Sequence, residues 1–197
     1  MPTEKEKMLR GEYYNSRDPE IIVLYHKARR LLKKYNYHLD SEDEKRRSAI
    51  LKELLGFVGE GVWIEPPFHA DYGENVFVGE NTFINTGCVF LDDNRITIGR
   101  NVLIAPMVQI YTASHPLKAS ERIIAEQVAG QENQATYLTN SKPVEIGDNV
   151  WIGGNTAILP GVKIGEGSTI GACSLVTKDI PPGVLAFGNP CRVVKEL

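Results

Sequence analysis

The sequence of 197 residues is poor in the side chains that most often mark a catalytic or metal centre. It has four histidines and three cysteines, and no His-x-x-x-x-His spacing occurs. A zinc site needs three or four ligands, usually His or Cys, so we do not expect a catalytic metal. The Gly-x-Ser-x-Gly motif is also missing, which argues against a serine nucleophile held on a strand-to-helix turn.

The chain also lacks the signals of secretion, of membrane insertion and of binding to polyanions. No apolar run approaches the roughly 18 residues of a membrane-spanning helix, and the N-terminus MPTEKEKMLR has no signal-peptide core. A net charge of -3 gives no general reason to bind nucleic acid or an anionic membrane. The cysteines, Cys88, Cys173 and Cys191, are odd in number and unpatterned, which favours reduced thiols. We therefore expect a cytoplasmic protein that binds neither nucleic acid nor membrane.

What the chain does have is a strict internal repeat over residues 144–179, VEIGDN VWIGGN TAILPG VKIGEG STIGAC SLVTKD. A period of six fits neither a helix nor a plain strand alternation. It fits short flat runs separated by turns, three of which close a triangular coil of about 18 residues. If the coils stack, the aliphatic residues at the third position of each six-residue unit form one continuous row in the interior, which we call the aliphatic ladder. These residues are Ile146, Ile152, Ile158, Ile164, Ile170 and Val176.

Glycine follows most of these aliphatic residues and indicates corners between the runs. A corner glycine either needs a positive φ or has no room for a Cβ, and Asn149 and Asn155 tolerate the same left-handed region. Parallel runs joined by such short turns cannot form a βαβ sheet, which needs long crossovers. We therefore predict a mainly β fold, a parallel β-helix built from the hexapeptide repeat.

Residues 1–57 have a different character and are predicted to form a helical N-terminal segment. Thr3–Arg10 reads as a short helix, and Asp18 reads as the N-cap of a second helix. The run Ser41–Glu44 has the pattern of a capping box. The helix behind it is expected to end at Gly56.

Residues 58–197 are predicted to form the β-helix domain, with one interruption and a cap. The repeat begins weakly at Ile64, slips by two residues at Asp93-Asn94 and resumes at Ile98. Residues 111–143 then interrupt it as a long polar loop, and loops of this length are usually functional or disordered. After Asp179 the chain is expected to form a strand or a short helical cap, because an open β-helix end exposes unpaired edges.

A β-helix wall has no deep cleft, so a site is expected where a loop leaves the wall or where subunits meet. His115 lies where the repeat breaks into the long loop. A neutral histidine is the usual general base for a hydroxyl group; the alternative is a loop histidine without function. Asp71, Asn85 and Asp93 could exchange hydrogen bonds with a hydroxyl-rich acceptor, or they could only form turns.

Together these motifs resemble the maltose/galactoside O-acetyltransferases, including the nodulation-type sugar acetyltransferases, of the hexapeptide-repeat acyltransferase superfamily. The opening TEKEKMLRGEYY is similar to the helical N-terminal segment of the maltose enzymes. Further blocks are similar in the same order: EPPFHADYG, NTFINTGCVFLD, ITIGRNVLIAPMVQIYTASHP and PVEIGDNVWIGGNTAILPGVKIGEGSTIGA. The resemblance covers nearly the whole chain.

The resemblance implies a homotrimer of left-handed β-helices, with active sites between neighbouring subunits. It implies acetyl-CoA as donor, a sugar hydroxyl as acceptor and no metal. His115 falls on the family's catalytic histidine, and Asp71, Asn85 and Asp93 fall on positions that contact the acceptor. The implied CoA contacts are Ala105, Gly154, Ala172, Thr177, Lys178, Arg192 and Lys195.

The segment from Pro116 to Lys142 departs from the family, because it is longer than the loop that usually reaches toward the acceptor. Three alternatives therefore stand beside a sugar O-acetyltransferase. One is an acetyltransferase of the same fold for an amino acid, an amino sugar or a xenobiotic. The others are a non-catalytic interaction subunit and a metalloenzyme.

Overall fold

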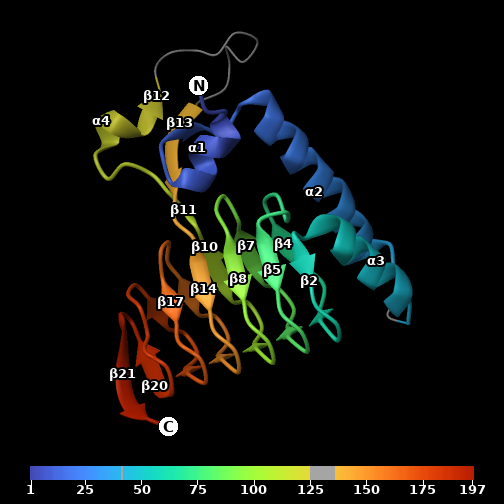
Figure 1. Cartoon of the computed structure of the whole chain (residues 1–197), viewed down its shortest axis with the longest axis vertical. Helices are drawn as coiled ribbons and strands as arrows, with labels where there is room; N and C mark the ends of the chain where they lie inside the picture. The colour runs from blue at the N-terminus through green and yellow to red at the C-terminus, as the bar shows by residue number, and fades with distance from the viewer. Residues whose placement is uncertain (41, 125–135) are drawn as a thin grey trace.

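The chain folds into a stack of coils with two of its helices at one end (Figure 1). The structure, a computed structural model, describes residues 1–40, 42–124 and 136–197. Its helices are α1 (Glu4–Arg10), α2 (Pro19–Tyr37), α3 (Glu44–Leu54) and α4 (Ala119–Arg122). Among the described residues, no helix combines the length and the apolar character needed to cross a bilayer.

Short parallel strands form the three walls of the stack, and each wall is named here after its strand from the strict repeat. The β14 sheet contains β2 (Phe57–Val58), β5 (Val76–Val78), β8 (Ile96–Ile98), β14 (Val144–Ile146) and β17 (Lys163–Ile164). The β15 sheet contains β3 (Trp63–Ile64), β6 (Phe83–Ile84), β9 (Leu103–Ile104), β15 (Trp151–Ile152), β18 (Thr169–Ile170), β20 (Val184–Gly188) and β21 (Cys191–Glu196). The β16 sheet contains β4 (His69–Ala70), β7 (Val89–Leu91), β10 (Gln109–Tyr111), β16 (Ala157–Ile158) and β19 (Leu175–Val176).

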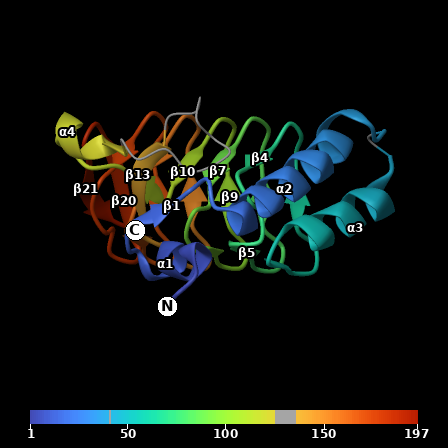
Figure 2. The same cartoon turned by 90° about the horizontal axis from the view of Figure 1, so that it is seen from above.

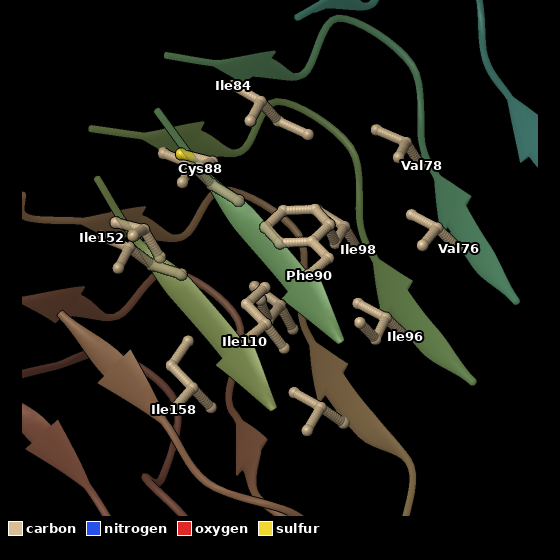
Figure 3. Packing of buried hydrophobic residues seen from close by; sticks show 14 of the residues in the cluster. Val76, Val78, Ile84, Cys88, Phe90, Ile96, Ile98, Ile110, Ile152 and Ile158 are labelled. Carbon is tan, nitrogen blue, oxygen red and sulfur yellow. The ribbon is translucent and has the colours of Figure 1, made fainter. Parts of the chain in front are cut away.

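The interior is the predicted aliphatic ladder. Parallel pairing aligns Ile84 with Ile104, Ile152 and Ile170 on successive coils, and all four side chains are fully buried. Figure 3 shows such residues pointing inward from neighbouring strands. Burying one isoleucine side chain contributes about 1.5–3 kcal/mol, so each added coil gains stability by covering the one below. The predicted fold class, a parallel β-helix with a helical N-terminal segment, is confirmed.

The glycines that follow the interior aliphatic residues, such as Gly153 and Gly165, are needed for lack of space, since neither has a positive φ. A Cβ on Gly153 would lie 2.4 Å from the backbone nitrogen of Ala172 on the next coil, and one on Gly165 would lie 2.3 Å from the nitrogen of Pro182. The left-handed conformation occurs at other corner positions, with φ of 59° at Asn149, 56° at Asn155 and 88° at Gly161.

The helices α2 and α3 cover the first coil, as expected of an end with unpaired edges. Leu31 of α2 and Leu51 of α3 belong to the same buried core as the ladder, and the Tyr35 hydroxyl donates to the carbonyl of Ile64. At the other end, β20 and β21 form an antiparallel pair. The cap after residue 179 is therefore a strand, the first of the two predicted forms.

The predicted end of α1 and the predicted N-cap of α2 are confirmed. The helix α1 begins at Glu4, one residue later than predicted, because Thr3 is its N-cap, and α3 also needs correction. Asp18 accepts from the backbone of Glu20 at 2.9 Å, as an N-cap should. For α3, Ser41 lies outside the described residues, and Asp43 stands at the N-cap without a side-chain cap bond. The helix ends at Leu54, before Gly56, because Leu55 already has extended backbone angles.

The interruption of the repeat is more regular than the predicted loop. It contains β11 (Ala113–Ser114), β12 (Ile123–Ile124) and β13 (Thr136–Ser141), and it pairs with β1 (Tyr14–Asn15) of the N-terminal segment. We call these four antiparallel strands the covering sheet. In Figure 2 β1 and β13 lie side by side next to the coils. The division into 1–57 and 58–197 stays a prediction, since β1 and β13 join the two parts.

Candidate active site

The predicted site residues gather along two edges of the triangular stack. At the glycine corner the chain passes from the β15 sheet to the β16 sheet. At the acidic corner it passes from the β16 sheet to the β14 sheet. Asn85, Ala105, Gly154 and Ala172 lie on successive coils of the glycine corner, after β6, β9, β15 and β18. Asp71, Asp93, Thr177 and Lys178 lie at the acidic corner, after β4, β7 and β19.

The remaining predicted residues lie just outside these two edges. His115 follows β11, at the point where the chain has left the acidic corner after β10. Arg192 and Lys195 are exposed on β21, at the far end of the β15 sheet. Because the strands of the β16 sheet separate the corners, a single chain groups His115 with Asp71 and Asp93 but does not bring Asn85 to them.

Asp92, which the sequence reasoning missed, organises the acidic corner. Its side chain is fully buried, and Oδ1 accepts the backbone N–H of Asp71 at 2.8 Å and of Tyr72 at 2.9 Å. The side-chain amide of Asn75 donates to the backbone carbonyl of Asp92 at 2.7 Å. A carboxylate on one coil therefore fixes the turn of the coil below that carries Asp71. The only signal in the sequence is the pair of aspartates in LDD.

Burial dominates the electrostatics of this corner. It raises the pKa of Asp71 to about 6, with the charge of Asp93 adding to the rise and Arg29, 2.9 Å away, opposing it. Burial also raises the pKa of Asp92 to about 8, against the backbone donors that favour its ionised form. The pKa of Asp93 is raised by burial and lowered in part by the Tyr14 hydroxyl and by His115. Tyr14 was not singled out from the sequence.

His115 is held by the main chain of the covering sheet. Its Nδ1 lies 3.0 Å from the carbonyl oxygen of Leu138 on β13, and 3.5 Å from Oγ1 of Thr139. A carbonyl oxygen can only accept, so Nδ1 carries the proton in this contact. Nε2 of the exposed ring is then left with a lone pair. The role of Leu138 could not be predicted from the sequence, because its backbone carbonyl, not its side chain, contacts His115.

Two surface pockets of the described part of the chain lie away from the predicted site residues. One lies between α3 and the first coil and is lined by Tyr35, Arg47 and Trp63 among others. The other lies on the outer face of the β14 sheet, beside Arg95 and Glu145. Neither is lined by a predicted site residue. Within 1–40, 42–124 and 136–197, no three His, Cys, Asp or Glu residues are grouped to hold a metal ion.

The two parts of the chain match two family descriptions. Residues 7–59 match the maltose acetyltransferase hexapeptide capping motif, and residues 143–178 match the bacterial transferase hexapeptide of six repeats. These are the helical segment with the first strand, and the strict repeat.

Known proteins similar to this chain are acetyltransferases. Galactoside O-acetyltransferase of Escherichia coli is 44% identical over 171 residues, covering 87% of this chain and 78% of that protein. The crystal structure of a maltose O-acetyltransferase from Clostridium difficile is 46% identical, with a TM-score of 0.88, and covers 100% of this chain and 98% of that one.

A hexapeptide-repeat acetyltransferase from Vibrio cholerae, complexed with acetyl coenzyme A, is 41% identical with a TM-score of 0.86, covering 100% and 99% of the two chains. Identities of this size over nearly full lengths, together with the β-helix and its helical cap, show the family. The chain belongs to the hexapeptide-repeat acetyltransferases of the maltose and galactoside O-acetyltransferase family, and it is an acyltransferase.

Proposed function

We propose that the protein transfers the acetyl group of acetyl-CoA to a hydroxyl of a sugar, with His115 as the general base. The observation that carries this proposal is the bond from His115 Nδ1 to the carbonyl of Leu138, 3.0 Å long. It selects the neutral tautomer whose Nε2 can accept a proton. General-base assistance accelerates such a step by about 10²–10⁴.

In the proposed reaction His115 Nε2 removes the proton of the acceptor hydroxyl as that oxygen attacks the acetyl carbonyl. Acetyl-CoA supplies the activated acyl group as a thioester. His115 then returns the proton to the departing sulfur, so the base is regenerated and no covalent enzyme intermediate is needed. A backbone N–H is the proposed donor to the developing oxyanion, and one such donor is worth about 10²–10³ in rate.

Acceptor binding is assigned to Asp71, Asn85 and Asp93. Carboxylate oxygens accept hydrogen bonds from sugar hydroxyls, and a carboxamide both donates and accepts. Asp71 and Asp93 already lie at one corner with His115 nearby. Asn85 lies at the other corner of the same chain, so its participation requires a second copy.

The family resemblance assigns CoA binding to Ala105, Gly154, Ala172, Thr177, Lys178, Arg192 and Lys195. The side chains at the glycine corner are small, which would let an extended pantetheine arm approach the backbone. Lys178, Arg192 and Lys195 are exposed, and such cations suit the phosphates of CoA. No metal has a step in this scheme.

A homotrimer would join the two corners. The outer row of the β15 sheet, with Trp63, Phe83, Leu103 and Trp151 in register, exposes Leu103 by 52% and Trp151 by 54%. A run of large exposed apolar side chains marks a surface that a partner covers. Closing three copies over this sheet would let the glycine corner of one copy face the acidic corner of the next. We also propose that the protein is cytoplasmic.

The proposal is tested by following CoA release with acetyl-CoA and a panel of acceptors. Maltose, glucose and a galactoside represent the sugars, and glucosamine and an amino acid represent amines. Turnover with the neutral sugars is expected. Turnover confined to the amines would favour the second candidate, an acetyltransferase for a non-sugar acceptor, which the carboxyl groups of Asp71 and Asp93 could attract as a cation. Absence of acetyl-CoA binding in calorimetry would contradict both and favour an interaction subunit.

A further inference from the structure

Strand β13 is shared between the N-terminal segment and the strand that leads to His115. On one edge it pairs with β1, with Tyr14 opposite Thr139 and Asn15 opposite Leu138. On the other edge it pairs with β11, with Ala113 opposite Ser141. The backbone that fixes His115 is thus also the backbone that fixes Tyr14.

Tyr14 reaches from this sheet to the acidic corner. Its side chain is 2% exposed, and its hydroxyl donates to Oδ1 of Asp93, which is 7% exposed. Burial, with the charge of Asp93 next, raises the pKa of Tyr14, so the hydroxyl keeps its proton and remains a donor. A carboxylate with one oxygen held by a fixed donor presents its other oxygen in a fixed direction.

The position of Tyr14 does not depend on Asp93 alone, because neighbouring contacts fix the same segment. The Asn94 side-chain amide donates to the carbonyl of Met8 at 3.2 Å and to Oγ of Ser141 at 3.0 Å. Ser141 in turn donates its hydroxyl to the Met8 carbonyl at 2.6 Å. These bonds lock the end of α1 to β13 beside Tyr14. The tyrosine is therefore the anchored partner, and Asp93 is the one that is oriented.

We propose that Tyr14 is a positioning residue of the acetyl-transfer site, whose hydroxyl orients Asp93 to receive the acceptor beside His115. This inference rests on the proposed function and adds the N-terminal segment to the active site. Tyr14 touches neither acetyl group nor base; it acts through Asp93.

The charged and titratable groups around Asp93 determine what the loss of this hydroxyl does. Asp71, Tyr72 and Asp92 surround it from the acidic corner, His115 from the covering sheet, and Arg29 acts through Asp71. Only Tyr14 and His115 among these favour the ionised form of Asp93 directly. Removing the Tyr14 hydroxyl should therefore raise the pKa of Asp93, and the acidic limb of the pH profile for the acceptor should move to higher pH.

The test is the Tyr14→Phe variant of the full chain, which keeps the buried ring and removes only the hydroxyl. Its matched control is Tyr35→Phe, which removes another buried tyrosine hydroxyl, bonded to the Ile64 carbonyl under the helices. Steady-state kinetics across pH and ¹³C NMR titration of the aspartate carboxyls are measured on both variants and on the wild-type chain. Thermal unfolding shows that the variants compared are folded.

For Tyr14→Phe we expect the KM for the acceptor to rise about tenfold, as for a lost hydrogen bond to a charged group. The KM for acetyl-CoA should stay within about twofold, because the glycine corner is untouched. The Asp93 resonance should titrate at higher pH. Tyr35→Phe should lose stability while both its acceptor KM and its Asp93 titration stay at the wild-type values.

An unchanged acceptor KM in Tyr14→Phe, or an unshifted Asp93 titration, would overturn the inference. A shift of equal size in Tyr35→Phe would also overturn it, because a general loosening of the fold would then explain both. If the wild-type chain transfers no acetyl group, the proposed function fails on its own. The Asp93 titration then decides whether Tyr14 orients this carboxylate.

Discussion

The glycine corner and the acidic corner border the same β16 sheet, yet they are built differently. At the glycine corner the coils approach so closely that Gly153 and Gly171 have no space for a Cβ. At the acidic corner, side chains replace backbone packing, and Asp92 bridges two coils through the amides of Asp71 and Tyr72. The first corner follows the repeat, whereas the second lies where the repeat slips and breaks.

This difference shows how a repetitive wall can carry a specific site. Strict repetition favours a straight edge of small residues, such as Ala105, Gly154 and Ala172 on successive coils. Chemistry needs positions that differ from one coil to the next, and the slip near Asp93 and the interruption after Tyr111 provide them. Changes at the glycine corner should therefore reduce stability first, and changes at the acidic corner should reduce activity first.

The largest expected effect is that of His115→Ala on turnover. Loss of the general base should lower kcat by at least about 10², with little change in the affinity for CoA. Initial rates with acetyl-CoA and an acceptor measure kcat, and calorimetry measures CoA binding. His26→Ala, an exposed histidine on α2, is the control and should keep wild-type activity. Near-normal turnover of His115→Ala would remove the histidine from its proposed role.

Gly153→Ala should mainly affect stability. The added Cβ would lie 2.4 Å from the nitrogen of Ala172, so the coils must separate, at a cost of about 1–3 kcal/mol in unfolding free energy. At the adjacent Gly154 the nearest atom, the Pro106 carbonyl oxygen, is 3.1 Å away, so Gly154→Ala should cost less. Urea denaturation of both variants measures the difference. Equal losses of unfolding free energy in the two variants would show that close contact between backbones is not the reason for glycine at this corner.

Asp92→Asn should make stability less dependent on pH. The pKa of Asp92 is about 8 in the folded chain because of burial, above its value of about 4 in an unfolded chain. The folded chain therefore binds more protons than the unfolded chain between these values, and the free energy of unfolding falls as pH rises through this range. The variant lacks this titrating group, so its free energy of unfolding should fall less between pH 5 and about 8 than that of the wild-type chain.

Urea denaturation at a series of pH values measures this slope. Asp148→Asn is the contrasting variant, because backbone and side-chain bonds from Arg100 lower the pKa of Asp148. That carboxylate stabilises the fold above its unfolded pKa, and its contribution is lost only as the pH falls through its lower folded pKa. Its replacement should leave the slope above pH 5 unchanged, since the carboxylate is ionised in both states there. An Asp92→Asn slope equal to that of the wild type would show that Asp92 does not titrate in this range.

The smallest expected effect is that of Lys178→Ala. This exposed lysine follows β19 at the acidic corner, and losing one charge contact with a CoA phosphate should raise the KM for acetyl-CoA several-fold. The effect should shrink as salt is added, because exposed charges are screened. Lys163→Ala removes a lysine that pairs with Glu145 at 3.0 Å on the β14 sheet, and it should not change this KM. Salt-independent behaviour of Lys178→Ala would argue against a phosphate contact.

The fold of the β-helix could be predicted well from the sequence, but the candidate active site could be predicted only in part. The third-place residues from Ile64 to Val176 could be assigned to the interior because a period of six leaves one place per run that always faces inward. His115 was found because it lies where the period fails, and Asp71 and Asp93 were found as polar residues within the first coils. Tyr14 was missed because nothing in the helical segment indicates which coil it will contact.

By itself the sequence determined the period, the three-walled coil, the aliphatic ladder and the corners that hold glycine and asparagine. These are local properties, since each depends on residues within one or two coils. Only the tertiary structure decided that β1 and β13 pair across more than a hundred residues of chain, that the Leu138 carbonyl selects the tautomer of His115, and that Tyr14 meets Asp93. Backbone groups are the same at every position, and a contact between distant segments exists only once the coils have stacked and placed both partners.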